Sequence, residues 1–444
     1  MKKLPKLLAE IPYDFARKRL SVLVQLEKPT LITKGAYSGI ADICSQARIN
    51  SKLVSMTKAR AELDAIYASE SNLGNRVLAI ATKQTDEAKE VSMVFEGFLV
   101  FADELKPDAA AEVARLQAQG IEFYLITGDN SLAAKYIASQ VGIPAENVVT
   151  GKDISSAGNS KLTAMVKSAR VFAEVDPLQK ARIVKTLSAA GNTVGFFGDG
   201  INDSAAIKAA DVGISVDTAV DIAKESAAIV LLDHNLDVIA KGVRLGRTTF
   251  VNTMKYVRVT ISANFGNVFS MAIASIFLPF LPLLPLQILL LNFLSDMPAL
   301  TIATDRVDES ELEKPHAWDI KQIRKAMISF GLISSIFDVA TFVILTQIFK
   351  ADQELFRTTW FIESCLTELI AMLVLRTKLP FYRSRASKPL SISSAVIAVL
   401  LFAIPFLPFA SSLVFVAISW QMTFVIFSLA AGYLLLNEMV KRRV

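Results

Sequence analysis

Two short polar segments hold the side chains best suited to chemistry in this sequence. They are Thr127-Gly128-Asp129-Asn130 and Gly198-Asp199-Gly200-Ile201-Asn202-Asp203. A threonine hydroxyl beside glycine backbone and free N–H groups can hold a phosphoryl oxygen. The carboxylates of Asp199 and Asp203 lie on one short turn and suit a hard, oxygen-preferring cation such as Mg²⁺. Between the two segments, Asp176-Pro177-Leu178-Gln179-Lys180 opens a helix and places a lysine to neutralise phosphate charge. A Gly-Asp-Gly sequence alone is usually only a turn, so the indication rests on the three segments together.

The apolar pattern around these segments predicts an α/β fold. Strands are expected at 98–101, 123–126 and 193–197, and helices at 108–119, at 131–140 and from Asp203 onward. This alternation of strand, loop and helix favours a parallel sheet. In such sheets ligands bind at the carboxyl ends of the strands. Both polar segments follow predicted strands, so we expect them at that edge.

The second half of the sequence predicts a membrane domain. The 444 residues are 52% hydrophobic with a mean hydropathy of +0.43, which excludes a disordered chain and is too high for an ordinary soluble protein. Each apolar run is near the ~20 residues that a membrane-spanning helix needs. The six runs are 257–279, 283–303, 326–349, 359–375, 390–410 and 413–436.

The distribution of lysine and arginine predicts the orientation of these spans. Basic residues gather at 306–325, 376–388 and 441–443, whereas the other loops hold only Lys350 and Arg357. By the positive-inside rule, residues 1–250 and the C-terminus are expected in the cytoplasm, in a multi-pass protein of the plasma membrane. The net charge of +5 is then explained by cytoplasmic loops, and no nucleic-acid partner is expected. Two cysteines exclude a disulfide framework, and no apolar signal peptide follows Met1.

Polar residues inside the apolar runs are candidates for binding a transported ion. Asn292, Ser295 and Asp296 share one helical face, and Pro298 is expected to interrupt that helix and free carbonyl oxygens. Interhelical hydrogen bonding is the alternative, above all for Asn264 in the preceding run. Oxygen ligands without Cys or His favour Mg²⁺ or Ca²⁺ over soft metals. The candidate ligands are Asn264, Asn267, Asn292, Ser295, Asp296 and Glu368, with Glu363 as the weaker choice on the fourth run.

These motifs together resemble the C-terminal half of a P-type cation-transporting ATPase. Thr127-Gly128-Asp129 resembles the family's TGD motif, Gly198 to Asp203 its GDGxND motif, and Lys180 its phosphate-sensing lysine. The resemblance implies a haloacid-dehalogenase-like phosphorylation domain, with ATP and Mg²⁺ as cofactors. It implies that Asp199 holds Mg²⁺, that Asn202 and Asp203 order that site, and that Thr127 and Gly128, with Asp129, contact the phosphoryl group. Two departures are Ser204-Ala205 after the second aspartate and Glu174 where an arginine is usual.

The first 90 residues resemble part of the nucleotide-binding domain of this family. An aromatic ring can stack on the adenine base and an arginine can pair with phosphate. The corresponding residues are Phe15, Arg17, Lys34, Gly35 and Arg76. Without the resemblance, Phe15 reads equally well as a core residue. The expected domains are a partial nucleotide-binding domain at 1–90, a partial phosphorylation domain at 91–250 and a six-helix transmembrane domain at 251–444.

Two sequences that the family uses in its reaction cycle do not occur in this chain. No Asp-Lys-Thr-Gly or Thr-Gly-Glu is present, so the aspartate that would be phosphorylated is absent. We therefore expect little activity from the chain alone and a partner that supplies the actuator domain, four helices and the aspartate. Asn264 to Ser270 resembles the bacterial magnesium-translocating ATPases, whereas Asn292 to Asp296 looks more like a calcium pump. Magnesium is the expected ion; a calcium pump, a non-catalytic pump fragment and, least favoured, a tethered phosphatase are the alternatives.

Overall fold

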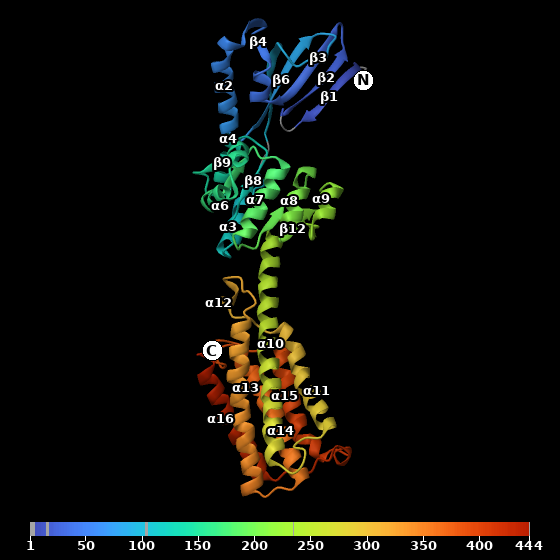
Figure 1. Cartoon of the computed structure of the whole chain (residues 1–444), viewed down its shortest axis with the longest axis vertical. Helices are drawn as coiled ribbons and strands as arrows, with labels where there is room; N and C mark the ends of the chain where they lie inside the picture. The colour runs from blue at the N-terminus through green and yellow to red at the C-terminus, as the bar shows by residue number, and fades with distance from the viewer. Residues whose placement is uncertain (1–4, 15–16, 103–104, 234, 444) are drawn as a thin grey trace. The chain divides into compact units, whose positions relative to one another are not determined.

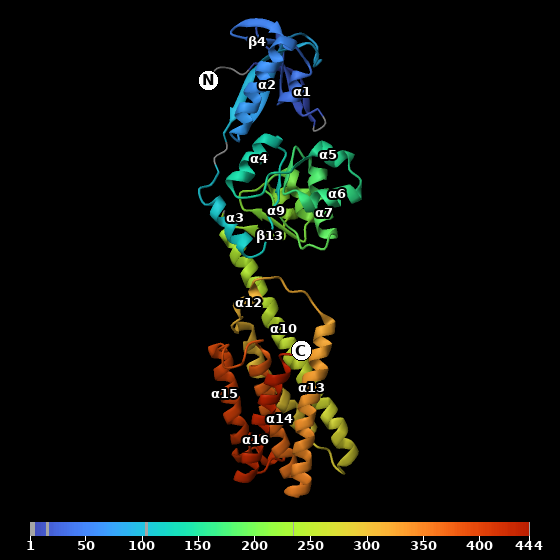
Figure 2. The same ribbon diagram turned by 90° about the vertical axis from the view of Figure 1, so that its left-hand side faces the viewer.

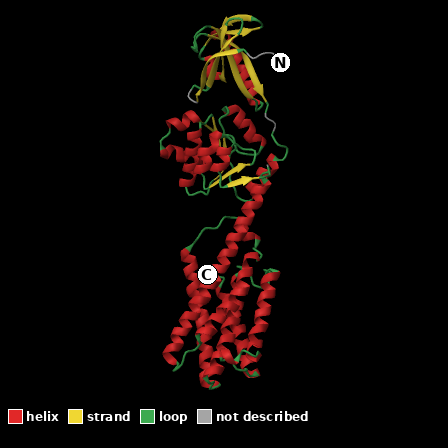
Figure 3. Ribbon diagram, turned by 90° about the vertical axis from the view of Figure 1, so that its right-hand side faces the viewer, coloured by secondary structure: helices red, strands yellow, loops and turns green. Residues whose placement is uncertain are grey.

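The chain folds as two units, residues 1–240 and 241–444, in a computed structural model that describes residues 5–14, 17–102, 105–233 and 235–443. Strands are found in the first unit and long helices in the second (Figure 3). The strands and helices of the first unit and the six long apolar helices agree with the predicted combination of an α/β unit with a transmembrane bundle.

A seven-stranded sheet begins the first unit. Its strands, in spatial order, are β1 (Lys6–Asp14), β2 (Arg19–Gln25), β3 (Pro29–Ala36), β6 (Arg76–Gln84), β7 (Met93–Phe101), β4 (Cys44–Ile49) and β5 (Lys52–Ser55). Helices α1 (Tyr37–Ala41) and α2 (Met56–Asn72) pack against it (Figure 2). Met56, Ala59 and Leu63 recur at helical spacing on α2 and bury one face of that helix in the core.

The sequence prediction for residues 98–101 needs a correction. These residues do form a strand, but they are the end of β7. The strand pairs antiparallel with β6 and parallel with β4, so it belongs to the seven-stranded sheet and not to the parallel sheet that carries the polar segments. Local apolarity identifies a strand without identifying its partner.

Two small parallel sheets follow. One has the order β8 (Leu125–Ile126), β10 (Val171–Ala173), β9 (Val148–Thr150), and the other β11 (Gly195–Phe197), β12 (Val212–Val216), β13 (Ile229–Leu231). The surrounding helices are α3 (Ala109–Ala118), α4 (Ser131–Gln140), α5 (Gly151–Ser156), α6 (Asn159–Ser168), α7 (Pro177–Ala189), α8 (Ser204–Ala209) and α9 (Asp221–Ser226). The predicted α/β pattern is thus confirmed from residue 108 onward.

Local capping fixes where the helices next to the polar segments begin. The Asn130 side chain accepts a hydrogen bond from the Ala133 N–H and starts α4. Asp176 and Gln179 form a reciprocal capping box at α7, and Pro177 occupies its first turn. Lys180 therefore stands one turn inside α7, a position set by short-range sequence alone.

Six helices of the second unit are long and apolar enough to cross a membrane, which confirms the predicted spans. They run side by side in Figures 1 and 2. Short helical segments join them, including α12 (Glu309–Leu312) and a π-helical turn, Ile344–Ile348, that continues α13. The six are α10 (Asp237–Phe277), α11 (Pro285–Thr301), α13 (Ile320–Val343), α14 (Gln353–Leu375), α15 (Lys388–Ala403) and α16 (Trp420–Val440).

Some boundaries differ from the sequence prediction. Helix α10 starts 20 residues before the predicted span, because its first turns are polar but still helical. Pro298 lies inside α11, which continues to Thr301, so the expected interruption of the helix does not occur there. Helix α14 is the most buried of the six and packs against α11, α13, α15 and α16. Glu363 and Glu368 on α14 therefore face protein, and the groups around them decide their role.

Candidate functional site

The loop after β8 holds the first polar segment in a tight turn. Thr127 Oγ1 donates to Asp129 Oδ2 over 2.9 Å, and the Asp129 N–H donates back to Thr127 Oγ1 over 3.1 Å. The backbone of this loop also bonds to residues 174 and 175 of the segment after β10. A Cβ on Gly128 would meet only a carbonyl oxygen at 3.6 Å, so the space beside it is open. Hydroxyl and N–H groups thus lie at the carboxyl edge of the sheet, as the sequence predicts.

The loop after β11 holds the second segment, and Lys180 reaches it from α7. Lys180 Nζ lies 2.7 Å from Asp203 Oδ1, and both side chains are largely buried. The other oxygen of Asp203 accepts the Gly200 N–H over 3.3 Å. A Cβ on Gly198 would lie 2.5 Å from the Asp203 Cβ, which only glycine avoids. The loop and the lysine are therefore brought together as the resemblance implies.

These side chains fit a Mg²⁺ ion that is held mainly by phosphate and water. Asp199 is exposed, and so is Asn202. Asp203 already meets a lysine ammonium, so it suits an orienting role better than direct coordination. In the part of the chain that the structure describes, no group of three His, Cys, Asp or Glu residues could hold a metal. Mg²⁺ commonly uses only one or two carboxylates beside substrate phosphates, so this absence is compatible with the expected site.

Arg76, one of the predicted nucleotide-binding residues, lies beside the first polar segment. Its Nε is 3.5 Å from Asp129 Oδ1, with the arginine side chain well exposed. Glu174, the departure from the family pattern, is also paired: its carboxylate is 3.6 Å from Lys18 Nζ. Lys18 and Glu174 both have positive φ, at 52° and 56°. The charge reversal at Glu174 is thus matched by a lysine in the nucleotide-binding part.

The remaining nucleotide-binding candidates are placed differently from one another. Lys34 is exposed on β3, and Gly35 is required by close packing, since its Cβ would lie 2.4 Å from the Lys18 carbonyl oxygen. Phe15 lies outside the described residues. Arg17 donates both bonds of its Nη1 to Glu90, over 2.8 and 2.9 Å. Its guanidinium is therefore already occupied by a carboxylate and faces no open phosphate site in this conformation.

Glu90 is a residue that sequence reasoning missed. Its carboxylate also accepts bonds from Arg19 Nε and Ser21 Oγ, each over 2.7 Å. Burial opposes its charge, but the hydrogen bonds from Ser21, Arg19 and Arg17 outweigh burial and hold the pKa of Glu90 below its ordinary value. No motif surrounds Glu90, and it lies 73 residues from Arg17, so no local signal marks it.

In the membrane unit, the predicted ion ligands come from three helices. Asn267 on α10 donates to Glu368 Oε1 on α14 over 2.6 Å, and Ser364 donates to Asn267 Oδ1 over 3.3 Å. Asn264, Asn267 and Asn292 line a cavity of about 90 Å³, together with Trp360 and Ser364. That volume holds several waters or a partly hydrated cation.

The other two ligand candidates on α11 differ in exposure. Ser295 is buried and donates to the Asn292 carbonyl oxygen over 3.2 Å. Asp296 is exposed on the next position of the same helix. The structure therefore assembles Asn264, Asn267 and Asn292 around one cavity with Glu368 bonded at its edge, while Asp296 does not line it.

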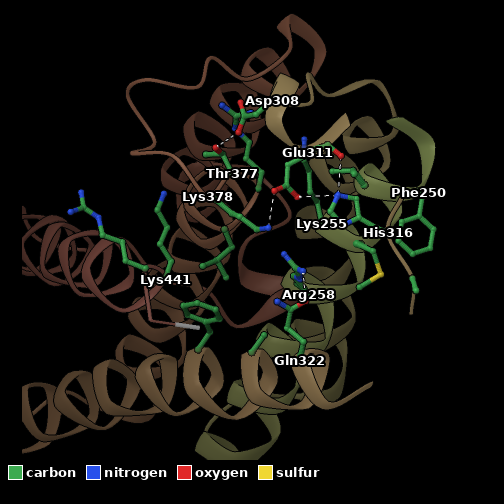
Figure 4. A pocket seen from close by; sticks show the side chains of 18 residues that line it. Phe250, Lys255, Arg258, Asp308, Glu311, His316, Gln322, Thr377, Lys378 and Lys441 are labelled. Carbon is green, nitrogen blue, oxygen red and sulfur yellow. Dashed lines mark hydrogen bonds and ion pairs between the residues drawn. The ribbon is translucent and has the colours of Figure 1, made fainter. Parts of the chain in front are cut away.

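A larger cavity of about 390 Å³ lies among α10, α13 and the ends of α14 and α16 (Figure 4). It is rich in basic side chains, but several are already paired. Lys378 Nζ lies 2.7 Å from Glu311, and Arg258 donates to Gln322 Oε1 over 2.9 Å. Lys255 Nζ lies 2.8 Å from Asp305 Oδ2. The cavity therefore borders a network of ion pairs that ties the helix ends together.

Asp305 is the centre of that network. Its side chain is fully buried and accepts bonds from Lys255, from Arg376 over 3.1 Å, and from the Ser387 N–H over 2.9 Å. Burial would raise the pKa of Asp305, but the hydrogen bonds from Lys255 and Ser387 and the nearby cations lower it below its ordinary value. The sequence marked Arg376 only as part of a positively charged loop and gave no sign that it would pair with Asp305.

Two protein-family descriptions match this chain. Residues 30–211 match the haloacid dehalogenase-like hydrolases, and residues 280–443 match the description "Cation transporting ATPase, C-terminus". A relative named "Magnesium-transporting ATPase, P-type 1" from Escherichia coli K12 is 40% identical over 97% of this chain. One of the same name from Salmonella typhimurium is 39% identical over 97% of it. A "Calcium-transporting ATPase 1" from Bacillus cereus is 28% identical over 80% of it.

The alignments also define how much of those relatives is matched. The chain covers 50% of the length of the Escherichia coli and Salmonella proteins and 42% of the Bacillus cereus protein. It therefore spans about half the length of these curated relatives. Together with the six apolar helices, the similarity indicates a multi-pass membrane protein.

Proposed function

The chain belongs to the P-type cation-transporting ATPases, whose C-terminal region it matches, and we propose that it forms part of an ATP-driven pump for Mg²⁺. The observation that carries this proposal is the 40% identity to a magnesium-transporting relative along 97% of the chain. The cavity lined by asparagines supports it, because a small number of neutral oxygens suits a cation that keeps part of its water shell.

In this proposal the first unit binds ATP and handles the phosphoryl group. Thr127 and the N–H groups beside Gly128 hold phosphoryl oxygens, and Lys180 neutralises their charge while Asp203 fixes its ammonium. Asp199 is the carboxylate available to Mg²⁺, with Asn202 beside it. Mg²⁺, when bound, supplies positive charge to the phosphates. Lys34 and Arg76 face the nucleotide, and Arg17 joins them only if it leaves Glu90.

A partner polypeptide is the second part of the proposal. Strands β8 and β11 are edge strands of separate parallel sheets, and among the described residues neither pairs on its other side. Ile126 in β8 and Val194 next to β11 belong to the same two packed cores, so these edges lie alongside each other. Phe197 of β11 is 47% exposed. Unpaired edges of this kind accept an added strand.

We infer that the added strand carries the phosphorylated aspartate of an Asp-Lys-Thr-Gly segment. Parallel addition between β8 and β11 would end that strand near Thr127 and Asp199, at the carboxyl edge where ligands bind. The partner would also bring the actuator domain and four further helices. The orientation with the first unit and the C-terminus in the cytoplasm, and a place in the plasma membrane, belong to the same proposal.

Phosphorylation of the reconstituted pump tests this function. We expect no acid-stable, hydroxylamine-sensitive phosphoenzyme from this chain with ATP, and labelling of the partner once a fragment with Asp-Lys-Thr-Gly is added. Asp199→Asn should lower that labelling by roughly 10²-fold or more, because it removes a carboxylate from the metal. Asp221→Asn, an exposed aspartate in α9, is the matched control. Labelling of this chain alone, or normal labelling in Asp199→Asn, contradicts the proposal.

The transported ion needs its own experiment, because calcium-transporting relatives also match. Asp296 does not line the cavity, but it is the one carboxylate on the face of α11 that carries Asn292 and Ser295, and in this proposal it joins the ion during transport. Asp296→Asn should therefore abolish ion-stimulated ATPase activity for either ion. Glu368→Gln should leave most Mg²⁺ transport intact in a magnesium pump and disable a calcium pump, since Ca²⁺ needs six to eight oxygens. Loss of Mg²⁺ transport in Glu368→Gln would count against this ligand assignment, and transport of Ca²⁺ alone would replace magnesium by calcium.

A further inference from the structure

The first unit has two parts that touch each other. One is the seven-stranded sheet with α1 and α2, and the other is the two parallel sheets with their helices. Lys18, in the turn between β1 and β2 of the sheet part, reaches Glu174, which follows β10 in the other part, and their charged atoms are 3.6 Å apart. The proposed function gives neither side chain a task, although Glu174 stands where an arginine is usual.

The backbone of Glu174 is fixed to the loop that the proposed function assigns to the phosphoryl group. Its φ of 56° lies in the left-handed region, which residues other than Gly, Asn and Asp seldom occupy. The surrounding structure holds this conformation, because the Glu174 N–H donates to the Asp129 carbonyl oxygen over 2.8 Å. The position of the Glu174 carboxylate is therefore tied to the phosphoryl-binding loop.

The turn that carries Lys18 is anchored on both sides. Lys18 also has a left-handed backbone, with φ of 52°, and its carbonyl oxygen accepts the Ala36 N–H over 2.9 Å. The residues before and after it are both held by Glu90, over 2.8 Å for Arg17 Nη1 and 2.7 Å for Arg19 Nε. Glu90 thus occupies the two arginines, and Lys18 is the cation at this turn that reaches the other part.

Further contacts join the same two parts. Helices α2 and α4 pack against each other, and Asn130 Nδ2 at the start of α4 donates to Ser71 Oγ near the end of α2 over 3.3 Å. Arg76 Nε lies 3.5 Å from Asp129 Oδ1 in the phosphoryl-binding loop. The two parts are therefore closed on each other with no nucleotide present, and the contacts lie where the proposed function places ATP.

We propose that Lys18 and Glu174 form an electrostatic latch that holds the two parts closed without nucleotide, and that ATP enters and leaves only when this latch opens. The two side chains are 43% and 38% exposed. An exposed ion pair shifts an equilibrium by at most about fivefold, and salt screens it. The latch is therefore weak enough for ATP to open. Its effect on ATP rests on the proposed function, whereas the closed state does not.

Distances between spin labels test the latch in the purified chain in phospholipid nanodiscs. The labels are attached at Glu62→Cys on α2 and Lys161→Cys on α6, both exposed positions, in a chain with Cys44→Ser. In Lys18→Glu and in Glu174→Lys, repulsion replaces attraction, so the ratio of closed to open molecules should fall by roughly three- to twentyfold.

The double charge reversal is the decisive variant of this experiment. Lys18→Glu combined with Glu174→Lys should restore the native distances, because the pair is remade with its charges exchanged. A variant that had merely misfolded would not be rescued in this way. Lys52→Glu, which makes the same change at an exposed lysine of β5, is the matched control and should leave the distances native. Native distances in both single reversals, or no rescue in the double variant, overturn the proposal.

Stopped-flow measurements with the fluorescent nucleotide trinitrophenyl-ATP test the effect on ATP. We expect faster association and dissociation in each single reversal, and native rates in the double variant. Added salt should speed dissociation from the native chain and change it less in the single reversals. Rates that do not respond to Lys18 and Glu174 while the distances do would refute the gating of ATP. If the native chain binds no nucleotide, the proposed function fails and the gating with it, while the distances still decide the latch.

Discussion

Replacing Asp305 by asparagine should destabilise the membrane unit more than any other single charge removal in its loops. The native carboxylate is fully buried and neutralises Lys255 and Arg376, whose side chains are 7% and 2% exposed. Asparagine keeps the shape but leaves two buried cations without an anion. Breaking a buried ion pair in this way costs about 3–5 kcal/mol. That corresponds to a change of roughly 10²- to 10⁴-fold in the unfolding equilibrium, at 1.4 kcal/mol for each factor of ten.

The measurement is a double-mutant cycle on the full chain, unfolded reversibly from lipid–detergent micelles. Asp305→Asn and Lys255→Met should each be destabilising, and the double variant should be much less so than their sum, because it leaves one unpaired cation fewer. The pair of Arg244 and Glu309 serves as the matched control. Its side chains are 55% and 74% exposed, so its coupling should stay below about 1 kcal/mol.

The pH dependence gives an independent test of the same site. The pKa of Asp305 is lower in the folded protein than its unfolded value of about 3.9. Its contribution to stability is therefore complete above that unfolded value and is lost as pH falls through the folded pKa. Asp305→Asn should remove this acid-dependent part. Additive effects in the cycle, or an unchanged acid limb in the variant, would refute the reasoning.

Three further outcomes follow from the described contacts. Gly198→Ala should displace Asp203, because the new Cβ would lie 2.5 Å from the Asp203 Cβ, and should lower the midpoint of thermal unfolding of the first unit by several degrees, measured by calorimetry. Glu90→Gln should remove stability that the native chain has above about pH 4.3 and loses as pH falls through the lowered pKa of Glu90, so equal acid unfolding curves would contradict it. In intact cells an impermeant thiol reagent should label Gln353→Cys, which is expected outside, and should not label Tyr382→Cys, which is expected in the cytoplasm; both positions are exposed. Labelling of Tyr382→Cys and not of Gln353→Cys would show that the proposed topology is wrong.

The sequence located the elements that depend on short-range chemistry. The caps at Asn130 and Asp176 start α4 and α7 where the pattern predicts, and the apolar runs became the six long helices. Helix caps and the lengths of apolar runs depend on residues close together in the chain. They can therefore be recognised from the sequence without knowledge of the tertiary structure. The two polar loops were found for the same reason, since each follows its strand directly.

The sequence did not predict which strands or side chains pair with one another. Residues 98–101 formed the predicted strand but joined a different sheet, because the pairing of β7 with β6 depends on contacts outside its own segment. Arg17 looked free to pair with phosphate, yet Glu90, 73 residues away, holds it. The predicted break at Pro298 did not end α11, since packing within the bundle keeps the helix continuous through its last turn.

The amino-acid sequence therefore determined which residues can do chemistry here and which segments can enter a membrane. The tertiary structure decided which charges are compensated: Asp305 gained two buried cations, whereas Glu363 gained no donor at all among the described residues. Sequence alone gives both residues the same formal charge. Their difference arises because burial makes the free energy of a carboxylate depend on the few groups that the fold brings within hydrogen-bonding distance.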